Sequence, residues 1–336
     1  MRAVVITKHG GPGVLQVQER PDPVLGPGQV RIEVAAAGIN FADVMARLGF
    51  YPDAPKTPCV VGYEVAGKIL ELGEGASSPE RPLSVGGRVF AGTQFGGYAS
   101  QVVAAAGDVV ALPDALSFEQ GAAIPVNYGT AWAGLLGYGS LRRGERVLIH
   151  SAGGGVGIAA TQIAKRTGAE VYGTASPGKH ARCIELGVDH AVDYTKPGWE
   201  RGLPKFDVIM DAIGGKSFRR SYDLLAPGGR LVAFGASAVV SGQRRNLVTA
   251  LSAVARMPRF NMVKQMSESK AVIGLNMLTL WKHSGTLEPW IGPMQEMLDD
   301  GTVAPVVAES FSFEDAGAAQ NMITERRNVG KVVLVP

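Results

Sequence analysis

The sequence predicts an α/β protein made of a β-rich domain and a doubly wound domain with a parallel sheet. The chain has 336 residues, a length that suggests about two domains. Short apolar runs broken by proline and glycine fill the first 120 residues or so. From about residue 145, strand-like and helix-like segments alternate, and a glycine-rich turn joins the first pair.

The first part of the chain has the pattern of short strands joined by turns. Apolar and β-branched residues gather in brief runs, and the proline and glycine residues between the runs mark turns. We therefore expect strands at residues 2–6, 28–38, 60–73 and 86–92.

The second part alternates between strand and helix, as expected for a parallel sheet covered by helices. Helices are expected at 156–166 and near 178–186, followed after about residue 278 by one or two more helices and a final strand. The predicted strands of the sheet are 146–150, 170–175, 190–194, 206–214 and 229–235. The predicted domains are 1–125, completed by 279–336, and 126–278.

Composition excludes several classes of protein. The net charge is only +3, which is too weak a balance for a nucleic-acid-binding protein. The two cysteines, Cys59 and Cys183, form no CxxC or metal spacing, so we expect a reducing, cytoplasmic location. The uncharged window 120–141 could span a bilayer by length, but Pro125, Asn127 and several glycines argue against a membrane helix.

The glycine-rich turn predicts a dinucleotide site. The spacing Ala152-x-Gly154-x-x-Gly157 is a Rossmann fingerprint with alanine in the first glycine place. Glycine lets the backbone approach a ligand closely, and the N-terminus of the following helix favours a phosphate. The predicted residues of this phosphate turn are Ala152, Gly153, Gly154, Gly155, Val156 and Gly157.

The end of the second predicted strand favours NADPH over NADH. An NAD site places a carboxylate about 20 residues after the glycines, and no carboxylate lies between Tyr172 and Lys179. Hydroxyl and ammonium groups suit the 2′-phosphate of NADPH. Alternatively, Lys179 is an ordinary solvated helix residue. The predicted cofactor residues here are Thr174, Ser176, Lys179 and Tyr194, with Lys196 nearby.

The chain resembles a known family, the zinc-free quinone oxidoreductases. The signature segment of these proteins is similar to residues 144–165, and their substrate-side segments are similar to residues 35–52 and 122–132. This zeta-crystallin-like group belongs to the medium-chain dehydrogenase/reductase superfamily. Residues 244–251 and 328–336 resemble its vesicle amine transport protein branch. The resemblance spans nearly the whole chain and implies a GroES-like first domain, a cleft between the domains, and a homodimer formed through residues 271–276.

The zinc ligands of the superfamily's alcohol dehydrogenases are missing. Asn40 stands where those enzymes have cysteine, Tyr63 stands where they have histidine, and Glu64 alone is no catalytic zinc site. Without that Lewis acid, alcohol oxidation is not expected. We expect no metal, and small apolar acceptors instead, either quinones or the C=C bond of α,β-unsaturated carbonyls.

The resemblance also implies residues around the substrate. Asn40, Asp43 and Tyr51 are the predicted catalytic residues, since donors near the nicotinamide can stabilise an oxyanion. Asn40 and Asp43 could instead serve a turn or a helix cap, and Tyr51 could simply line the cleft. The further residues expected to face the cofactor are Asn127, Thr130, Gly235, Gly274, Asn276 and Asn328.

Residues 242–270 form a basic segment with a broken helical stripe of leucine, valine and methionine. Pro258 is expected to interrupt any helix there. The segment could be a helix packed on the cofactor domain, a mobile cover of the cleft, or a membrane-surface helix. Membrane association is not favoured, but an NADPH-binding vesicle-associated or structural protein with little turnover stays an alternative function.

Overall fold

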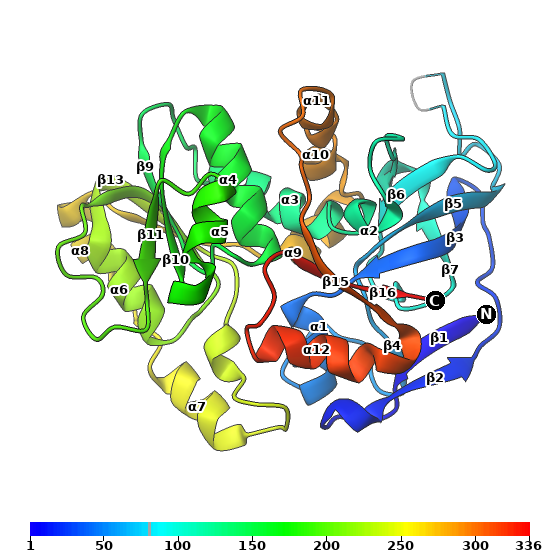
Figure 1. Cartoon of the computed structure of the whole chain (residues 1–336), viewed down its shortest axis with the longest axis horizontal. Helices are drawn as coiled ribbons and strands as arrows, with labels where there is room; N and C mark the ends of the chain where they lie inside the picture. Colours follow the sequence, from blue (N-terminus) through cyan, green and yellow to red (C-terminus); the bar gives the residue numbers. More distant parts are fainter. Residues whose placement is uncertain (80–81) are drawn as a thin grey trace.

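The computed structural model describes residues 1–79 and 82–336. Two sheet-based parts lie side by side in Figure 1, with the parallel sheet and its helices on the left and the first 110 residues or so on the right. The predicted α/β class, with a β-rich part and a Rossmann-like part, is confirmed. The precise domain limits stay a prediction.

The β-rich part contains two sheets. A three-stranded sheet has the order β2-β1-β4 and consists of β1 (Arg2–Ile6), β2 (Leu15–Glu19) and β4 (Cys59–Val60). A seven-stranded sheet has the order β15-β16-β3-β5-β6-β8, with β7 paired to β3. Its strands are β3 (Gln29–Gly38), β5 (Glu64–Leu72), β6 (Arg88–Gly92), β7 (Gln101–Ala105), β8 (Val109–Ala111), β15 (Val307–Ser312) and β16 (Lys331–Val335).

The sequence prediction joined β4 and β5 into one strand, and this was wrong. A turn at residues 61–63 separates the two strands, and Gly62 takes a positive φ of 101° there. Because only glycine adopts that backbone easily, the turn redirects the chain from the small sheet to the large one. Tyr63 and Glu64 therefore lie at the beginning of β5, where the cleft described below starts.

The second part is a six-stranded sheet with the order β11-β10-β9-β12-β13-β14, and every neighbouring pair is parallel. The order reverses between β9 and β12, which is the switch point where such folds bind ligands. The strands are β9 (Arg146–Ile149), β10 (Glu170–Ala175), β11 (His190–Asp193), β12 (Phe206–Asp211), β13 (Leu225–Ala233) and β14 (Ala271–Gly274).

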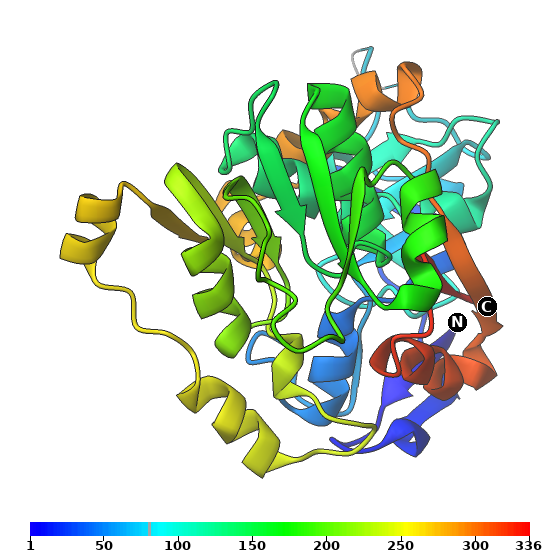
Figure 2. The same ribbon diagram turned by 60° about the vertical axis from the view of Figure 1, so that its left-hand side comes forward.

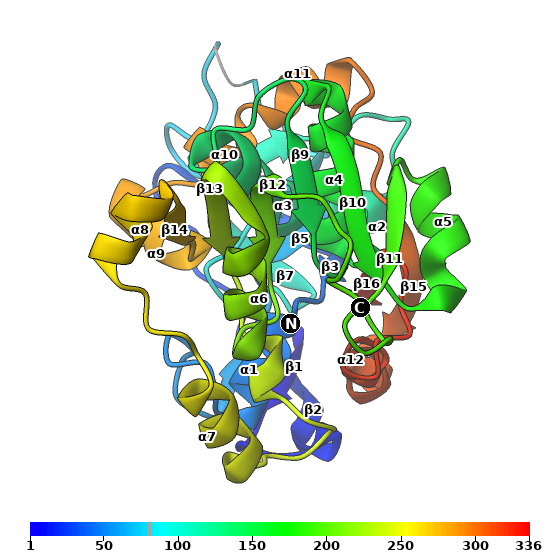
Figure 3. The ribbon, with the colours of Figure 1, turned by 90° about the vertical axis from the view of Figure 1, so that its left-hand side faces the viewer.

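Helices cover this sheet. Figure 3 shows α4, α5 and α6 around it, with α4 packed against β9 and β10 and α6 against β12 and β13. Small side chains of α4, among them Ala159, Ala160 and Ala164, are fully buried and let the helix lie close to the strands. These helices are α4 (Gly155–Thr167), α5 (His180–Glu185) and α6 (Lys216–Leu224).

The remaining helices connect the two parts. After β14 the chain forms three short helices and then returns to the first part, where β16 pairs antiparallel with β3. Both termini therefore lie on the β-rich side in Figure 1. The helices are α1 (Phe41–Leu48), α2 (Phe118–Gly121), α3 (Pro125–Trp132) with a π-helical extension (Ala133–Gly137), α9 (Met277–Ser284), α10 (Glu288–Ile291), α11 (Met294–Asp299) and α12 (Ala316–Thr324).

The basic segment 242–270 forms two helices, α7 (Leu247–Ala255) and α8 (Met262–Glu268), separated by the stretch that holds Pro258. Figure 2 shows this segment looping outward, with α7 near the β-rich part and α8 beside the parallel sheet. Its exposed apolar side chains are Leu247, Val248, Leu251, Val254, Met262, Val263 and Met266. Within the described ranges, no helix has the length and apolar character needed to cross a membrane.

Candidate functional site

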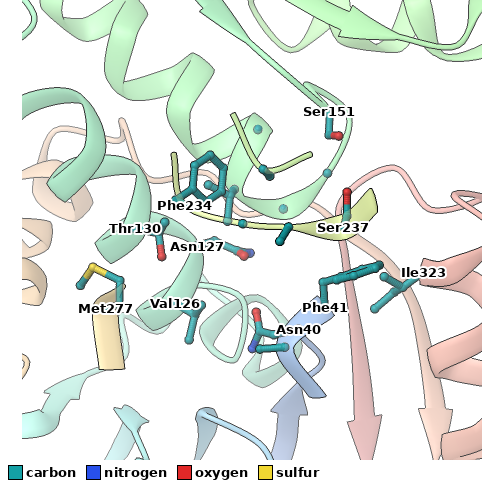
Figure 4. A pocket seen from close by; sticks show the side chains of 18 of the residues that line it. Asn40, Phe41, Val126, Asn127, Thr130, Ser151, Phe234, Ser237, Met277 and Ile323 are labelled. Atoms are coloured by element: carbon teal, nitrogen blue, oxygen red, sulfur yellow. The ribbon is translucent and has the colours of Figure 1, made fainter. Parts of the chain in front are cut away.

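A cleft of about 970 Å³ lies where the two parts meet. Figure 4 shows the side chains of Asn40, Asn127 and Thr130 around the same space, with Ser151 on the side of the parallel sheet. Two residues predicted for the site, Asp43 and Ala152, do not line this cleft. All others do: Asn40, Tyr51, Asn127, Thr130, Gly153, Gly154, Gly155, Val156, Gly157, Thr174, Ser176, Lys179, Tyr194, Gly235, Gly274, Asn276 and Asn328.

The glycine-rich turn leaves the start of α4 open. Gly154 is the N-cap and offers no side chain to the backbone N–H groups of the first turn, which are therefore free to bind an anion. A Cβ on Gly155 would lie 2.5 Å from Asn127, and one on Gly157 would lie 2.4 Å from the Ser151 carbonyl oxygen. Both positions therefore require glycine. Ala152 is buried beneath the turn, where it packs against Gly173.

The end of β10 gathers hydroxyl and cationic groups. Ser176, Lys179 and Tyr194 all line the cleft, as predicted from the sequence. The Lys179 ammonium donates to the carbonyl oxygens of Arg326 at 2.7 Å and Asn328 at 2.5 Å. Lys179 thus ties the C-terminal segment to the part of the protein that holds the parallel sheet. Burial lowers the pKa of Lys179. These two hydrogen bonds argue against the alternative in which Lys179 is an ordinary solvated helix residue.

Arg326 is a site residue that was not predicted from the sequence. Its guanidinium lies 5.9 Å from the centre of the Tyr194 ring, and the residue lines the cleft. Its φ of 57° is left-handed, a conformation that costs energy for any residue except glycine. The turn before β16 thus places the Arg326 guanidinium beside Tyr194, one of the residues predicted to bind the 2′-phosphate. No local pattern marks Arg326, because its neighbours in space, Lys179 and Tyr194, come from the segments that follow β10 and β11.

A second cavity of about 510 Å³ extends the site toward α7. It shares His150, Thr174, Tyr194 and Arg326 with the main cleft. Five residues of the basic segment also line it: Val248, Thr249, Ser252, Ala253 and Arg256. The segment 242–270 therefore borders the site next to residues 213–217, which lead from β12 into α6. The Arg47 guanidinium donates to the carbonyl oxygen of Gln243 at 3.2 Å and holds the start of this segment against α1.

Asn40 and Asp43 hold the start of α1. Asn40 is the N-cap, and its backbone N–H donates to the Asp43 carboxylate at 2.8 Å. Asp43 is fully buried and also accepts from the Tyr98 hydroxyl at 2.8 Å and the Gly62 N–H at 3.3 Å. Burial raises the pKa of Asp43 to about 7. Asp43 does not line the cleft, and its bond from the Asn40 N–H agrees with the helix-cap alternative.

Asn40 also belongs to a buried cluster with Glu64 and Lys331. The Lys331 ammonium contacts a Glu64 carboxylate oxygen and donates to the Asn40 side-chain oxygen at 2.7 Å. The Asn40 amide donates to Glu64 at 3.0 Å, and the Val126 N–H donates to the other Glu64 oxygen at 2.7 Å. Lys331 and Glu64 are only 3% and 0% exposed. This pair was not predicted from the sequence, because the two residues are 267 positions apart.

Two tyrosines line the same region of the cleft. The rings of Tyr51 and Tyr63 meet edge-on with centroids 6.3 Å apart, and Phe95 packs on Tyr63 at 5.1 Å. Burial raises the pKa of both phenols, with the nearby carboxyl groups of Asp53 and Asp43 acting in the same direction. Both groups are therefore neutral donors at ordinary pH.

The other predicted residues on this side have defined contacts. The Asn127 amide donates to the Ala123 carbonyl oxygen at 2.9 Å, and Asn328 donates to that of Gly330 at 2.8 Å. Asn276 caps α9 through the N–H groups of residues 278 and 279. These contacts fix each amide in one orientation, and all three residues line the cleft.

The residues present do not form a metal centre. Throughout residues 1–79 and 82–336, no group of three or more His, Cys, Asp and Glu side chains could hold a metal ion. The buried ammonium of Lys331 lies against Glu64, the only carboxylate at the zinc-ligand positions. Asn40 and Tyr63 occupy the other two of these positions.

Comparisons with known proteins agree with this geometry. Residues 26–114 match the alcohol dehydrogenase GroES-like domain, and residues 186–334 match the zinc-binding dehydrogenase family. The human synaptic vesicle membrane protein VAT-1 homolog is 33% identical over 344 residues, with 100% of this chain and 86% of that protein covered.

Two solved structures are similar over nearly their whole length. The CurK enoyl reductase is 26% identical with a TM-score of 0.85, covering 99% of this chain and 98% of that one. The quinone oxidoreductase from Thermus thermophilus, also solved in complex with NADPH, is 30% identical with a TM-score of 0.79, and both chains are covered completely.

Proposed function

Because the chain belongs to the medium-chain dehydrogenase/reductase superfamily, among the quinone oxidoreductase-like proteins, we propose that it is a zinc-independent, NADPH-dependent reductase. Its acceptors are quinones or the C=C bond of α,β-unsaturated carbonyls. The observation that carries this proposal is the shared cleft, which joins an open glycine-rich helix start to a wall of neutral donors around a buried ion pair.

The residues around the turn fit the cofactor. The first-turn N–H groups of α4 would hold the pyrophosphate, and Ser176, Lys179, Tyr194 and Arg326 would hold the 2′-phosphate. When bound, NADPH supplies the hydride that reduces the acceptor. Solved relatives of this fold bind NADPH, and the absence of a carboxylate at the end of β10 supports the same choice here.

The residues on the opposite wall act on the acceptor. Hydride addition places negative charge on the acceptor's oxygen, and a neutral phenol can give that oxygen a proton. Tyr51 is the proposed donor, since it lines the cleft and burial keeps it protonated. Asn40 contributes an amide held in one orientation by Glu64 and Lys331, so it needs no rearrangement during the reaction.

Zinc independence follows from the donor set. A catalytic zinc takes three protein ligands, usually histidine, cysteine or a carboxylate. The positions in question hold an asparagine, a tyrosine and Glu64, and Lys331 and the Val126 N–H already satisfy the oxygens of Glu64. An ammonium thus lies against the one carboxylate that a metal would need.

The acceptor is small and apolar. The cleft is lined with largely apolar surface by Tyr51, Val126, Phe234 and Met277.

The assembly is a homodimer. The strand β14 lies at the edge of the parallel sheet, so its backbone can pair with the same strand of a second copy. Sedimentation analysis tests the dimer, and a monomer at micromolar concentration refutes it.

One observation favours a second candidate function. Seven exposed apolar side chains on α7 and α8 lie among the basic residues of the segment 242–270. A protein that binds NADPH but turns over little, and associates with vesicles through this segment, would explain such a surface. Titration of the protein with anionic and neutral vesicles tests this alternative.

The proposed activity is tested by NADPH oxidation with a quinone panel and an enone panel. The expected result is turnover with members of at least one panel, undiminished by a metal chelator. Tight NADPH binding without turnover of any acceptor contradicts the proposal and favours the second function.

A further inference from the structure

Tyr63 holds a buried hydroxyl that the resting structure leaves unused. The residue is 7% exposed, and across the described part of the chain its hydroxyl oxygen makes no hydrogen bond of normal geometry. Buried polar groups are nearly always paired, because burying an unpaired one costs free energy. An unpaired phenol at the wall of a cleft therefore points to a partner that exists only during the reaction.

The surroundings of Tyr63 restrict what that partner is. The aromatic rings of Tyr51 and Phe95 pack against it, and its hydroxyl is closed off from solvent. The edge-on contact places the Tyr51 and Tyr63 phenols next to one another, without a hydrogen bond of normal geometry between their hydroxyl groups. A hydrogen bond from Tyr63 favours the ionised form of Tyr51, because hydrogen bonds to a charged form stabilise it.

The reaction creates that ionised form. Hydride adds to the β-carbon of an enone, and the C=C electron pair shifts so that the carbonyl oxygen becomes an enolate. The Tyr51 O–H bond then breaks, its proton passes to the enolate oxygen, and the phenol oxygen keeps the electron pair. The resulting phenolate, which later regains a proton from water, is the acceptor that Tyr63 lacks in the resting cleft.

We propose that Tyr63 is a positioning residue whose hydroxyl donates a hydrogen bond to the Tyr51 oxygen as Tyr51 gives up its proton. This inference rests on the proposed role of Tyr51 as proton donor. A donor that is already oriented toward the developing charge costs no reorganisation when the charge appears. Tyr63 stands where the zinc enzymes have a histidine ligand.

The test is a double-mutant cycle with Tyr63→Phe and Tyr51→Phe. Tyr63→Phe is expected to lower kcat about tenfold or more, the effect of one hydrogen bond to a charged group, with KM and NADPH affinity unchanged. In the Tyr51→Phe background the same substitution is expected to have no further effect. Turnover is measured with a simple enone and with a benzoquinone, and NADPH affinity by fluorescence titration.

Tyr222 supplies a matched control, because its hydroxyl is also buried without a hydrogen bond of normal geometry but lies in a different core away from the cleft. Tyr222→Phe and Tyr63→Phe should both keep or raise the melting temperature, whereas only Tyr63→Phe should slow turnover. If Tyr63→Phe is silent while Tyr51→Phe is slow, only this inference fails. Equal effects in both backgrounds also overturn it, and a silent Tyr51→Phe overturns the role of Tyr51 together with it.

Discussion

Replacing Arg326 by glutamine should remove most of the preference for NADPH over NADH. The guanidinium lies 5.9 Å from the centre of the Tyr194 ring, and the residue lines the cleft where the 2′-phosphate is proposed to bind. A hydrogen bond between charged partners contributes about 1.5–3 kcal/mol. Because Arg326 is exposed, solvent screens it and the lower figure applies, which corresponds to about a tenfold rise in the Kd for NADPH. The Kd for NADH should not change.

The assay is fluorescence titration of both cofactors at two salt concentrations. Arg327→Gln is the matched control, because Arg327 is an exposed neighbour that pairs with Glu325 at 2.8 Å and does not line the cleft. Wild-type protein and the control should lose NADPH affinity as salt increases, and Arg326→Gln should lose less. An unchanged NADPH affinity in Arg326→Gln, or a parallel loss for NADH, would refute the reasoning.

The other predictions concern two lysines, Tyr51 and the basic segment. Lys179→Glu should erase most of the gap between the NADPH and NADH dissociation constants, because it repels the 2′-phosphate; equal constants in the wild-type protein would contradict this. Tyr51→Phe should lower enone turnover about a hundredfold and spare NADPH affinity, whereas a nearly silent variant would make Tyr51 a wall residue. Lys331→Met should cost about 3–5 kcal/mol in urea unfolding, because it leaves Glu64 buried without its cation; a cost below about 1 kcal/mol would argue against the ion pair. Residues 242–270 should exchange amide hydrogens fast without ligand and become protected when NADPH and an apolar acceptor bind together; strong protection in the free protein would favour a packed helix, and protection only with anionic vesicles a membrane surface.

Local patterns were enough to predict the parallel-sheet part of the protein and its glycine-rich turn. The turn at Gly154 and Gly157 lies between a strand and a helix that follow one another directly. The spacing of its glycines was therefore enough to predict the conformation of the turn. The alternation of strand and helix after residue 145 likewise indicates a parallel sheet, in which all neighbouring strands except β9 and β12 follow one another in the chain. Pro258 interrupts the basic segment as expected, since proline cannot continue a helix.

The cluster of Asn40, Glu64 and Lys331 beside the cleft depends on contacts that no local pattern contains. Lys331 reaches Glu64 across 267 positions, and Lys179 reaches the Arg326 carbonyl across 147. Both contacts exist because the chain returns to the first sheet after completing the second. Asp43 shows a different limit, since its type and position suited both catalysis and a helix cap; its complete burial and its bond from the Asn40 N–H agree with the cap.

The central claim, a reductase that uses NADPH and needs no metal, is tested most directly by one measurement. Protein treated with a chelator is mixed with NADPH or NADH and with quinone and enone acceptors, and the loss of cofactor absorbance is followed. We predict oxidation of NADPH in preference to NADH, at a rate equal to that of untreated protein. Activity that disappears with the chelator and returns with zinc, or no oxidation of bound NADPH by any acceptor, would contradict it.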